Sequence, residues 1–341
     1  MTSAEIRERA HQCGFELAGV ARAEPVAERA WFHQWVARGF AAEMQYLTDR
    51  RAQIRSDPRN LLASARSIIC VGKLYNSPAP HSTAFTDRER AWISRYAWGD
   101  DYHDVVRHGL ERLDECLRQN AGYESKICVD TAPLLERSYA RLAGLGWIGK
   151  NTCLINQQSG SWFFLGELLV SLSIDPDEPP PDLCGTCTRC IDACPTAAIV
   201  PGSLGYTVDS GRCISYFTIE LRGAVPEPER ALSGSHVFGC DICQDVCPWN
   251  RRAAVTDEPP FRPRHFAPPL ERLAAITEDE FRTMFRGTPV TRARYAGFLR
   301  NVAVAMGNSG EVRFRTPLEK LAAGPDALVA EHAAWALDQL R

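Results

Sequence analysis

The N-terminal segment of this 341-residue sequence lacks both a long apolar run and a small-residue cleavage site. We therefore expect no signal peptide, no membrane partner and a cytoplasmic protein. The arginine pair at 50–51 is not followed by an apolar stretch, which excludes a twin-arginine export signal. The formal net charge of −3 does not mark a globally basic nucleic-acid binder, so any basic surface must be local.

Glycine motifs for phosphate binding are missing as well. Neither GxGxxG nor GxxxxGKS/T follows any strand-like segment, so the sequence does not support a dinucleotide fold or a P-loop. Apolar strand candidates instead alternate with helical patterns, notably over 101–121, and predict an α/β domain over 1–176 with a mixed sheet and flanking helices. The strand candidates are 15–21, 67–75, 126–130, 152–156 and 163–174.

Proline-rich segments divide the rest of the chain. The first is DPDEPPPD at 175–182, and the second is TDEPPFRPRHFAPPL. We expect a cysteine-rich module over 177–255 and a linker with a helical unit over 256–341. In that unit TEDE is a capping box, and Thr291 is expected to cap the next helix. Four helical patterns in two pairs predict a HEAT-like unit.

Eight of the thirteen cysteines fall between 184 and 247, where a disulfide framework is not expected in a reducing compartment. CGTCTRCIDACP is the bacterial ferredoxin run C-x2-C-x2-C-x3-C-P, whose fourth cysteine binds the neighbouring cluster, and CDICQDVCP repeats its ending. The spacing predicts two [4Fe–4S] clusters with crossed ligands, fed by an external one-electron donor. The first cluster takes Cys184, Cys187, Cys190 and Cys247, and the second takes Cys194, Cys213, Cys240 and Cys243.

Two structural zinc sites are the alternative, since they also use C-x2-C pairs, but the two proline-terminated runs favour iron–sulfur clusters. Cys213 is assigned to the second cluster because it is the one spare cysteine near the second motif. We interpret the other five cysteines as small buried hydrophobic residues: Cys13, Cys70, Cys116, Cys128 and Cys153.

Several segments together resemble the epoxyqueuosine reductase family. Besides the ferredoxin run, they are ISRYAWGDDYH (93–103), VDTAPLLERSYARLAGLGWIGKNTCLI (129–155), RCISYFTIELRG (212–223) and FGCDICQDVCPWN (238–250). The resemblance implies an enzyme that reduces epoxyqueuosine to queuosine at the wobble position of tRNA anticodons. It also implies that electrons pass through the two clusters to cobalamin, and that the reaction consumes two electrons and two protons.

The resemblance further implies that Asp130 protonates the departing oxygen, for which its pKa is expected to be raised by burial. On the residues alone, the cap of the following helix is the favoured role for Asp130, and the two roles are not exclusive. Cobalamin is implied to bind with its own base displaced and without a protein ligand beneath the cobalt, because DYHDVV at His103 lacks the glycine of D-x-H-x-x-G. The implied cobalamin contacts are Arg95, Tyr96, Asp130, Lys150, Asn151, Thr152, Ser215, Cys240 and Asp241.

A local basic surface for tRNA is expected in the C-terminal unit, where residues 281–315 contain seven arginines and one acid, Glu311. The candidate nucleic-acid contacts are Arg222, Arg292, Arg294 and Arg300, although such runs are often only solvated faces. The alternatives are a corrinoid iron–sulfur reductive dehalogenase and a non-enzymatic ferredoxin-type electron carrier. We expect a monomer, because no long apolar stripe is left over.

Overall fold

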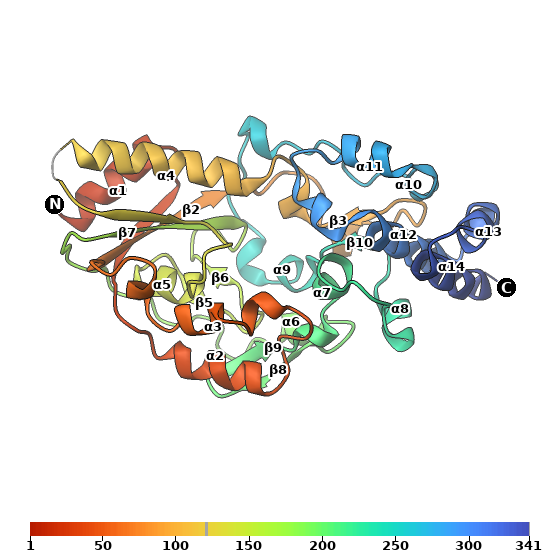
Figure 1. Ribbon diagram of the computed structural model, residues 1–341, viewed down its shortest axis with the longest axis horizontal. Coiled ribbons are helices and arrows are strands. Elements are labelled where there is room, and N and C mark those ends of the chain that lie inside the picture. Colours follow the sequence, from red (N-terminus) through yellow and green to blue (C-terminus); the bar gives the residue numbers. More distant parts are fainter. Residues whose placement is uncertain (120–121, 341) are drawn as a thin grey trace.

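The computed structural model describes residues 1–119 and 122–340. The end of the helical pattern predicted over 101–121 and the last residue of the predicted C-terminal unit lie outside the described residues. A β-sheet with its helices lies at one end of the molecule, the C-terminal helices lie at the other, and the cysteine-rich segment lies between them (Figure 1). No described helix is both long and apolar enough to span a membrane.

The main sheet has four strands in the order β1-β2-β7-β4, and each neighbouring pair is antiparallel. A mixed sheet was predicted, but the main sheet is antiparallel throughout. In the described part of the chain, the parallel pairing is found between the short strands β3 and β10, which form a separate sheet. All eight residues of β2 are buried, because helices cover both faces of the sheet. The strands are β1 (Leu17–Arg22), β2 (Ser67–Leu74), β4 (Ser125–Cys128) and β7 (Phe163–Val170).

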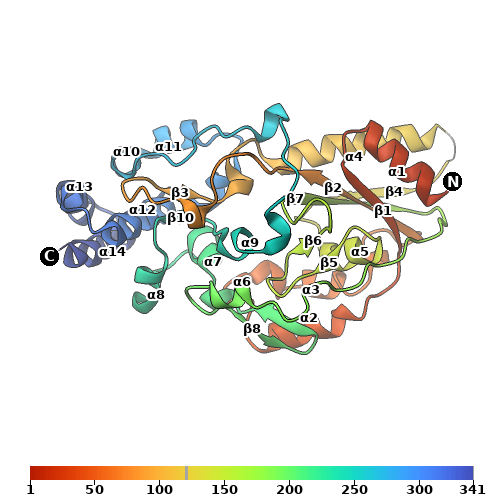
Figure 2. The ribbon, with the colours of Figure 1, turned by 180° about the vertical axis from the view of Figure 1, so that it is seen from behind.

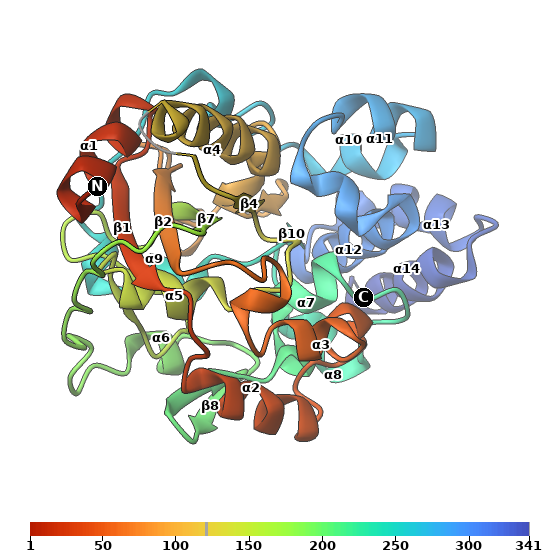
Figure 3. The same cartoon turned by 60° about the vertical axis from the view of Figure 1, so that its left-hand side comes forward.

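Helices α1 (Ser3–Gln12) and α4 (Tyr102–Arg118) cover one face of this sheet, and α5 (Glu136–Leu142) covers the other (Figure 3). α4 follows the predicted period, with a buried stripe that includes Val106, Leu110 and Leu113. α2 (Glu28–Ala37) and α3 (Arg51–Ile54) lie below the sheet, beside the middle segment.

The middle segment consists of short elements joined by loops (Figure 2). A two-stranded hairpin, β5 (Trp147–Ile148) with β6 (Leu154–Ile155), precedes the first cysteine motif. The elements that follow are α6 (Arg189–Asp192), β8 (Ile199–Gly202), β9 (Gly205–Val208), α7 (Ile214–Ile219), α8 (Glu227–Leu232), β10 (His236–Phe238) and α9 (Ile242–Asp245).

The C-terminal helices share one hydrophobic core with earlier parts of the chain. This core includes Trp92 of β3 (Trp92–Ile93), Val237 of β10 and Phe298 of α12. The helices are α10 (Leu270–Ala275), α11 (Glu278–Met284), α12 (Tyr295–Ser309), α13 (Arg315–Ala322) and α14 (Ala327–Gln339).

The caps of these helices follow the sequence only in part. The predicted capping box begins α11, where the side chain of Thr277 accepts the N–H of Glu280. The prediction for Thr291 is wrong, because this residue lies inside the 3-10 helix η8 (Pro289–Ala293) and its hydroxyl donates to the carbonyl of Thr288. α12 therefore begins later than expected, after Arg294, which has a φ of 58°.

Candidate active site

Four of the predicted cluster cysteines line one cavity of about 380 Å³. Cys184, Cys187 and Cys190 come from the first motif, and Cys247 comes from the end of the second motif. Burial raises the pKa of the Cys190 thiol to about 11, and the nearby thiols of Cys184 and Cys247 add to this effect. The fold thus gathers the cysteines that the crossed assignment gives to the first cluster.

The other four predicted ligands form a second group. The Cys240 thiol interacts electrostatically with Cys213 and Cys194, and the Cys243 thiol interacts with Cys240 and Cys213. The two groups therefore separate as the crossed assignment expects, with Cys194 leaving its own motif to join the second group.

Backbone amides point at the sulfurs of the second group. The N–H of Ala198 donates to Sγ of Cys194 at 3.3 Å, and the N–H groups of Ser215 and Tyr216 donate to Cys213. Such donors stabilise thiolates and tune the reduction potential of a cluster. Four gathered cysteines in each group, with amides on the sulfurs, fit the chemistry of two cubane clusters.

Zinc, the alternative considered on the sequence, gains no support from the geometry. Across residues 1–119 and 122–340, no three His, Cys, Asp or Glu side chains lie close enough to hold a single metal ion. A cube binds each thiolate at a different iron, so its ligand sulfurs are spread more widely than those around one zinc ion. The described residues thus offer no single-ion site at either cysteine group.

Lys150 and Asn151 connect the two cysteine groups. Lys150 Nζ donates to two backbone carbonyls of the first motif at 2.8 and 2.9 Å, and Asn151 Nδ2 donates to the carbonyl of Cys243 at 3.2 Å. The next residue, Thr152, has a φ of 62°, which is strained for a β-branched side chain. Strained backbone is concentrated at functional sites, so this turn is a good candidate for one.

Cys153 differs from the simple buried hydrophobic residue that the sequence suggested. Its thiol accepts a hydrogen bond from Cys243, which lowers the pKa of Cys153 despite burial. It therefore lies against the second cysteine group. Cys70 and Cys128 are buried in the apolar core beside α5, as expected.

Asp130 lies in the loop between β4 and α5, with a φ of 49°. Its Oδ2 is 3.2 Å from Nε2 of His103, and Nδ1 of His103 is 2.7 Å from Oδ1 of Asp101. Asp101 also caps α4, so the start of this helix orients the imidazole. The side chain of Asp130 is 44% exposed, which leaves the carboxylate accessible to a substrate.

The pKa of Asp130 is lowered, contrary to the direction expected from the sequence. The surrounding protein partly desolvates the carboxyl and so raises its pKa, but hydrogen bonds from His103 and Tyr102 and the positive charge of His103 outweigh that effect. Burial lowers the pKa of His103, yet its hydrogen bonds to Asp101 and Asp130 raise it to about 9. At neutral pH the proton of this pair is therefore held by His103.

Two tyrosines connect this acid to the second cysteine group. Tyr102 hydrogen-bonds with Asp130, and its ring lies edge-on to Tyr96 with centroids 6.2 Å apart. Tyr96 interacts electrostatically with both Asp130 and Asp241, the residue after Cys240. Asp130 and the second cysteine group thus border the same region of the molecule.

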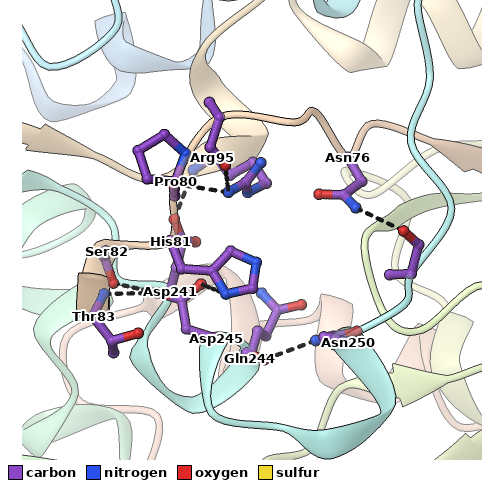
Figure 4. A network of polar contacts seen from close by, with 12 residues as sticks. Asn76, Pro80, His81, Ser82, Thr83, Arg95, Asp241, Gln244, Asp245 and Asn250 are labelled. Carbon is purple, nitrogen blue, oxygen red and sulfur yellow. Dashed lines mark hydrogen bonds and ion pairs between the residues drawn. The ribbon is translucent and has the colours of Figure 1, made fainter. Parts of the chain in front are cut away.

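Arg95 and Asp241 have internal roles (Figure 4). Asp241 accepts the N–H of Arg95 at 2.8 Å and is also bonded to Trp92 and Ser94. The Arg95 guanidinium donates to the backbone carbonyls of residues 77, 79 and 80. With Asn151, these are the buried members of the predicted cobalamin set. The partly or fully exposed members are Tyr96, Asp130, Lys150, Thr152, Ser215 and Cys240.

Three of the predicted nucleic-acid arginines gather near the acid. Arg292 Nε is 2.6 Å from Oε1 of Glu220, and its guanidinium lies over the ring of Tyr46. Arg222 donates to the backbone carbonyl of Arg292 at 2.9 Å, and its charge interacts with that of Arg294. The positive charge of Arg292 also reaches Asp130, so this basic cluster and the acid share one region.

Arg300 is the exception, and its assignment to a nucleic-acid surface is wrong for this structure. The residue is 1% exposed, and its guanidinium donates to the carbonyls of Phe217, Leu221 and Gly223. It joins α12 to the segment that follows Cys213. Its helix is buried along almost its whole length, so the charge is internal rather than on a solvated face.

Sequence reasoning missed several residues of this region. His103 was considered only as a cobalt ligand, and Tyr102, Glu136 and Glu220 received no role. One of these residues had a signal in the sequence. Asp101 suits the cap of a helix, which would place its carboxylate beside His103, two residues further along the chain. The contact between His103 and Asp130 spans 27 residues and has no local signature.

Two groups of four cysteines beside a carboxylate–imidazole pair define an iron–sulfur oxidoreductase. Residues 183–250 match the family described as 4Fe-4S double cluster binding domain, and residues 55–131 match Epoxyqueuosine reductase QueG, DUF1730. Epoxyqueuosine reductase of Xanthomonas campestris pv. campestris is 41% identical, over 99% of this chain and 96% of its own length. The chain belongs to the epoxyqueuosine reductase family and is an enzyme.

Solved structures give the same result. A crystal structure of epoxyqueuosine reductase with an epoxyqueuosine-modified tRNA-Tyr stem loop has a TM-score of 0.89 at 29% identity, covering 99% of this chain and 89% of its own. The Bacillus subtilis enzyme, with an aspartate-bearing catalytic loop swung out of the active site, has a TM-score of 0.88 at 29% identity. That match covers 99% of this chain and 90% of its own.

Proposed function

We propose that this chain reduces epoxyqueuosine in a tRNA anticodon loop to queuosine, with Asp130 delivering a proton to the departing oxygen. The reaction balances as epoxide plus two electrons and two protons giving alkene and water. The observation that carries the proposal is the contact between Asp130 and the protonated His103, beside the second cysteine group.

The cofactors of this proposal are two [4Fe–4S] clusters on the crossed cysteine sets and cobalamin near Asp130. When bound, the clusters carry single electrons and cobalamin supplies a strongly reducing cobalt centre to the substrate carbon. The residues that fit a corrin are the exposed members of the predicted set, above all Tyr96, the left-handed Thr152 and Ser215. Arg95 and Asp241 would act indirectly, by holding the loops beside it.

Base-off binding without a protein ligand beneath the cobalt is also part of the proposal. Carboxylates occupy both ring nitrogens of His103, which leaves neither nitrogen free for a metal. Asp130 then faces the oxygen of the substrate. Its carboxylate takes a proton from His103, whose raised pKa keeps it loaded at neutral pH, and passes the proton on. An unpaired aspartate would release its proton to water at this pH.

The tRNA partner is supported by the stem loop bound to a solved relative. Arg222, Arg292 and Arg294 are the residues that we propose to contact phosphate, since they form one basic cluster whose charge reaches Asp130 through Arg292. We further propose the division 1–176, 177–255 and 256–341, a HEAT-like packing of the C-terminal helices, a monomeric enzyme and an external one-electron donor.

The test is single-turnover reduction by the full chain, reconstituted with iron, sulfide and cobalamin and reduced chemically. The substrate is a tRNA stem loop that carries the epoxide, and mass spectrometry of the base reports the loss of one oxygen. We expect complete conversion, and no dehalogenation of a halophenol under the same conditions. Unchanged epoxide, with both clusters and cobalamin bound, contradicts the proposal.

A further inference from the structure

Two carboxyl groups that the proposed reaction does not use face each other behind Asp130. Glu167 lies on the central strand β7, in register with Cys70 of β2 and Cys128 of β4, and is 0% exposed. Glu136 is the first residue of α5, the helix that covers this face of the sheet. A carboxyl group in such a place is costly unless it is paired or protonated, so its presence calls for a reason.

The surroundings of the two groups favour their protonated forms. In the parts of the chain that the structure describes, no N–H or O–H group reaches either carboxyl oxygen of Glu167. Its nearest titratable neighbour is Glu136, and two carboxylates in this position would repel each other. Burial raises the pKa of Glu136 to about 8 and that of Glu167 well above its ordinary value, so the pair stays protonated at neutral pH.

Glu136 also holds the loop that carries the acid. Its Oε1 accepts the backbone N–H of Asp130 at 2.5 Å. The φ of 49° at Asp130 is disfavoured for any residue with a Cβ, so this conformation needs support from outside the residue. The bonds from Thr131 to Val129 and from Leu134 to Ala132 stay within the loop. The Glu136 contact instead ties the loop to the start of α5.

We propose that Glu136, backed by Glu167, is a positioning residue that grips the Asp130 amide and holds the acid-bearing loop in its catalytic conformation. The acid pair explains why Glu136 has a fixed orientation: Glu167 is held in place by the central strand, and protonation removes the repulsion between the two groups. This inference rests on the proposed role of Asp130. In the Bacillus subtilis relative a catalytic aspartate loop leaves the active site, so such a loop needs a device that retains it.

The test compares four variants of the full chain reconstituted with its cofactors. Glu136→Ala removes the acceptor, whereas Glu136→Gln keeps an oxygen for the Asp130 amide and an NH₂ for Glu167. Glu167→Leu leaves Glu136 without its partner in an apolar setting and serves if Glu136→Ala does not fold. Glu28→Ala is the matched control, because Glu28 pairs with Arg141 at the other end of α5 and does not touch the loop.

The first readout is hydrogen–deuterium exchange at the Asp130 amide. We expect protection in the wild type, in Glu136→Gln and in Glu28→Ala, and loss of protection in Glu136→Ala and Glu167→Leu. The second readout is steady-state turnover with excess chemical reductant, in which Glu136→Ala should lower kcat on the order of a hundredfold with the KM for the stem loop unchanged. Glu136→Gln should restore the rate.

An Asp130 amide that stays protected in both Glu136→Ala and Glu167→Leu overturns the inference, as does a free amide with an unchanged kcat. Failure of the underlying proposal looks different. If Asp130→Asn retains full turnover while the amide still depends on Glu136, the contact is real and Asp130 is not the acid.

Discussion

Nε2 of His103 lies 3.2 Å from Oδ2 of Asp130, and the proton between them belongs to the imidazole at neutral pH. A lone aspartate with a lowered pKa is a poor general acid, because it is almost always deprotonated at neutral pH. The pair solves this problem: His103 stores the proton and Asp130 presents it.

Asp130→Asn should preserve the fold, both clusters and bound cobalamin while it removes most turnover. Asparagine has the same shape as aspartate, and the backbone N–H at position 130 can still donate to Glu136. Its side-chain amide cannot deliver a proton to the oxygen of the epoxide. A general acid contributes on the order of a hundred- to ten-thousandfold in rate. Single-turnover reduction with chemically reduced enzyme measures the loss, and near-normal turnover would assign the acid to another residue.

The single-turnover rate should fall as the pH rises through about 9, because His103 then loses its proton. A histidine with a raised pKa contributes stability that is complete below its ordinary pKa of about 6.5 and is lost as the pH rises through the folded value. Asp101→Asn removes one of the two carboxylates that raise this pKa. The fall in rate at high pH, the alkaline limb of the pH–rate profile, should therefore move to lower pH. A limb that stays in place in this variant rules out His103 as its source.

Cys194→Ala should remove the second cluster, although Cys194 belongs to the first motif. The second cysteine group holds its sulfur near Cys240 and Cys213. Cys190→Ala is the matched control and should remove the first cluster, because Cys190 lines the cavity with Cys247. Iron analysis and electron paramagnetic resonance distinguish the two, and loss of the same signal in both variants contradicts the crossed assignment.

Arg294→Gln should weaken binding of the tRNA stem loop and flatten its salt dependence by about 0.7–0.9 per lost phosphate contact. No described carboxylate forms an ion pair with Arg294, whereas Arg292 is already paired with Glu220. Arg300→Gln should instead lower the free energy of unfolding by about 3 kcal/mol, because it deprives buried carbonyls of a charged donor. Titrations at several salt concentrations and denaturant unfolding separate the two effects.

The sequence predicts best those features that depend on residues close to one another in the chain. The strand at 67–75 was evident because a fully buried strand is a continuous apolar run, and the cysteine sets followed from ligand spacing that a cube imposes. The pKa of Asp130 was predicted in the wrong direction, since its partner His103 comes from a different element. Charge says nothing about burial either: Arg300 resembles its exposed neighbour Arg294 in sequence but lies inside the protein.

The hydrogen bonds from Arg300 to the carbonyls after Cys213 make the cysteine-rich segment depend on the C-terminal helices. The next residue, Asn301, donates to the carbonyls of Thr218 and Val237, so two consecutive side chains of α12 hold both the segment that follows Cys213 and the strand β10 that leads to Cys240. A chimaera that replaced the C-terminal helices with those of another protein would lose these donors. We expect the first defect of such a chimaera to be a lower iron content, which would appear before any change in RNA specificity.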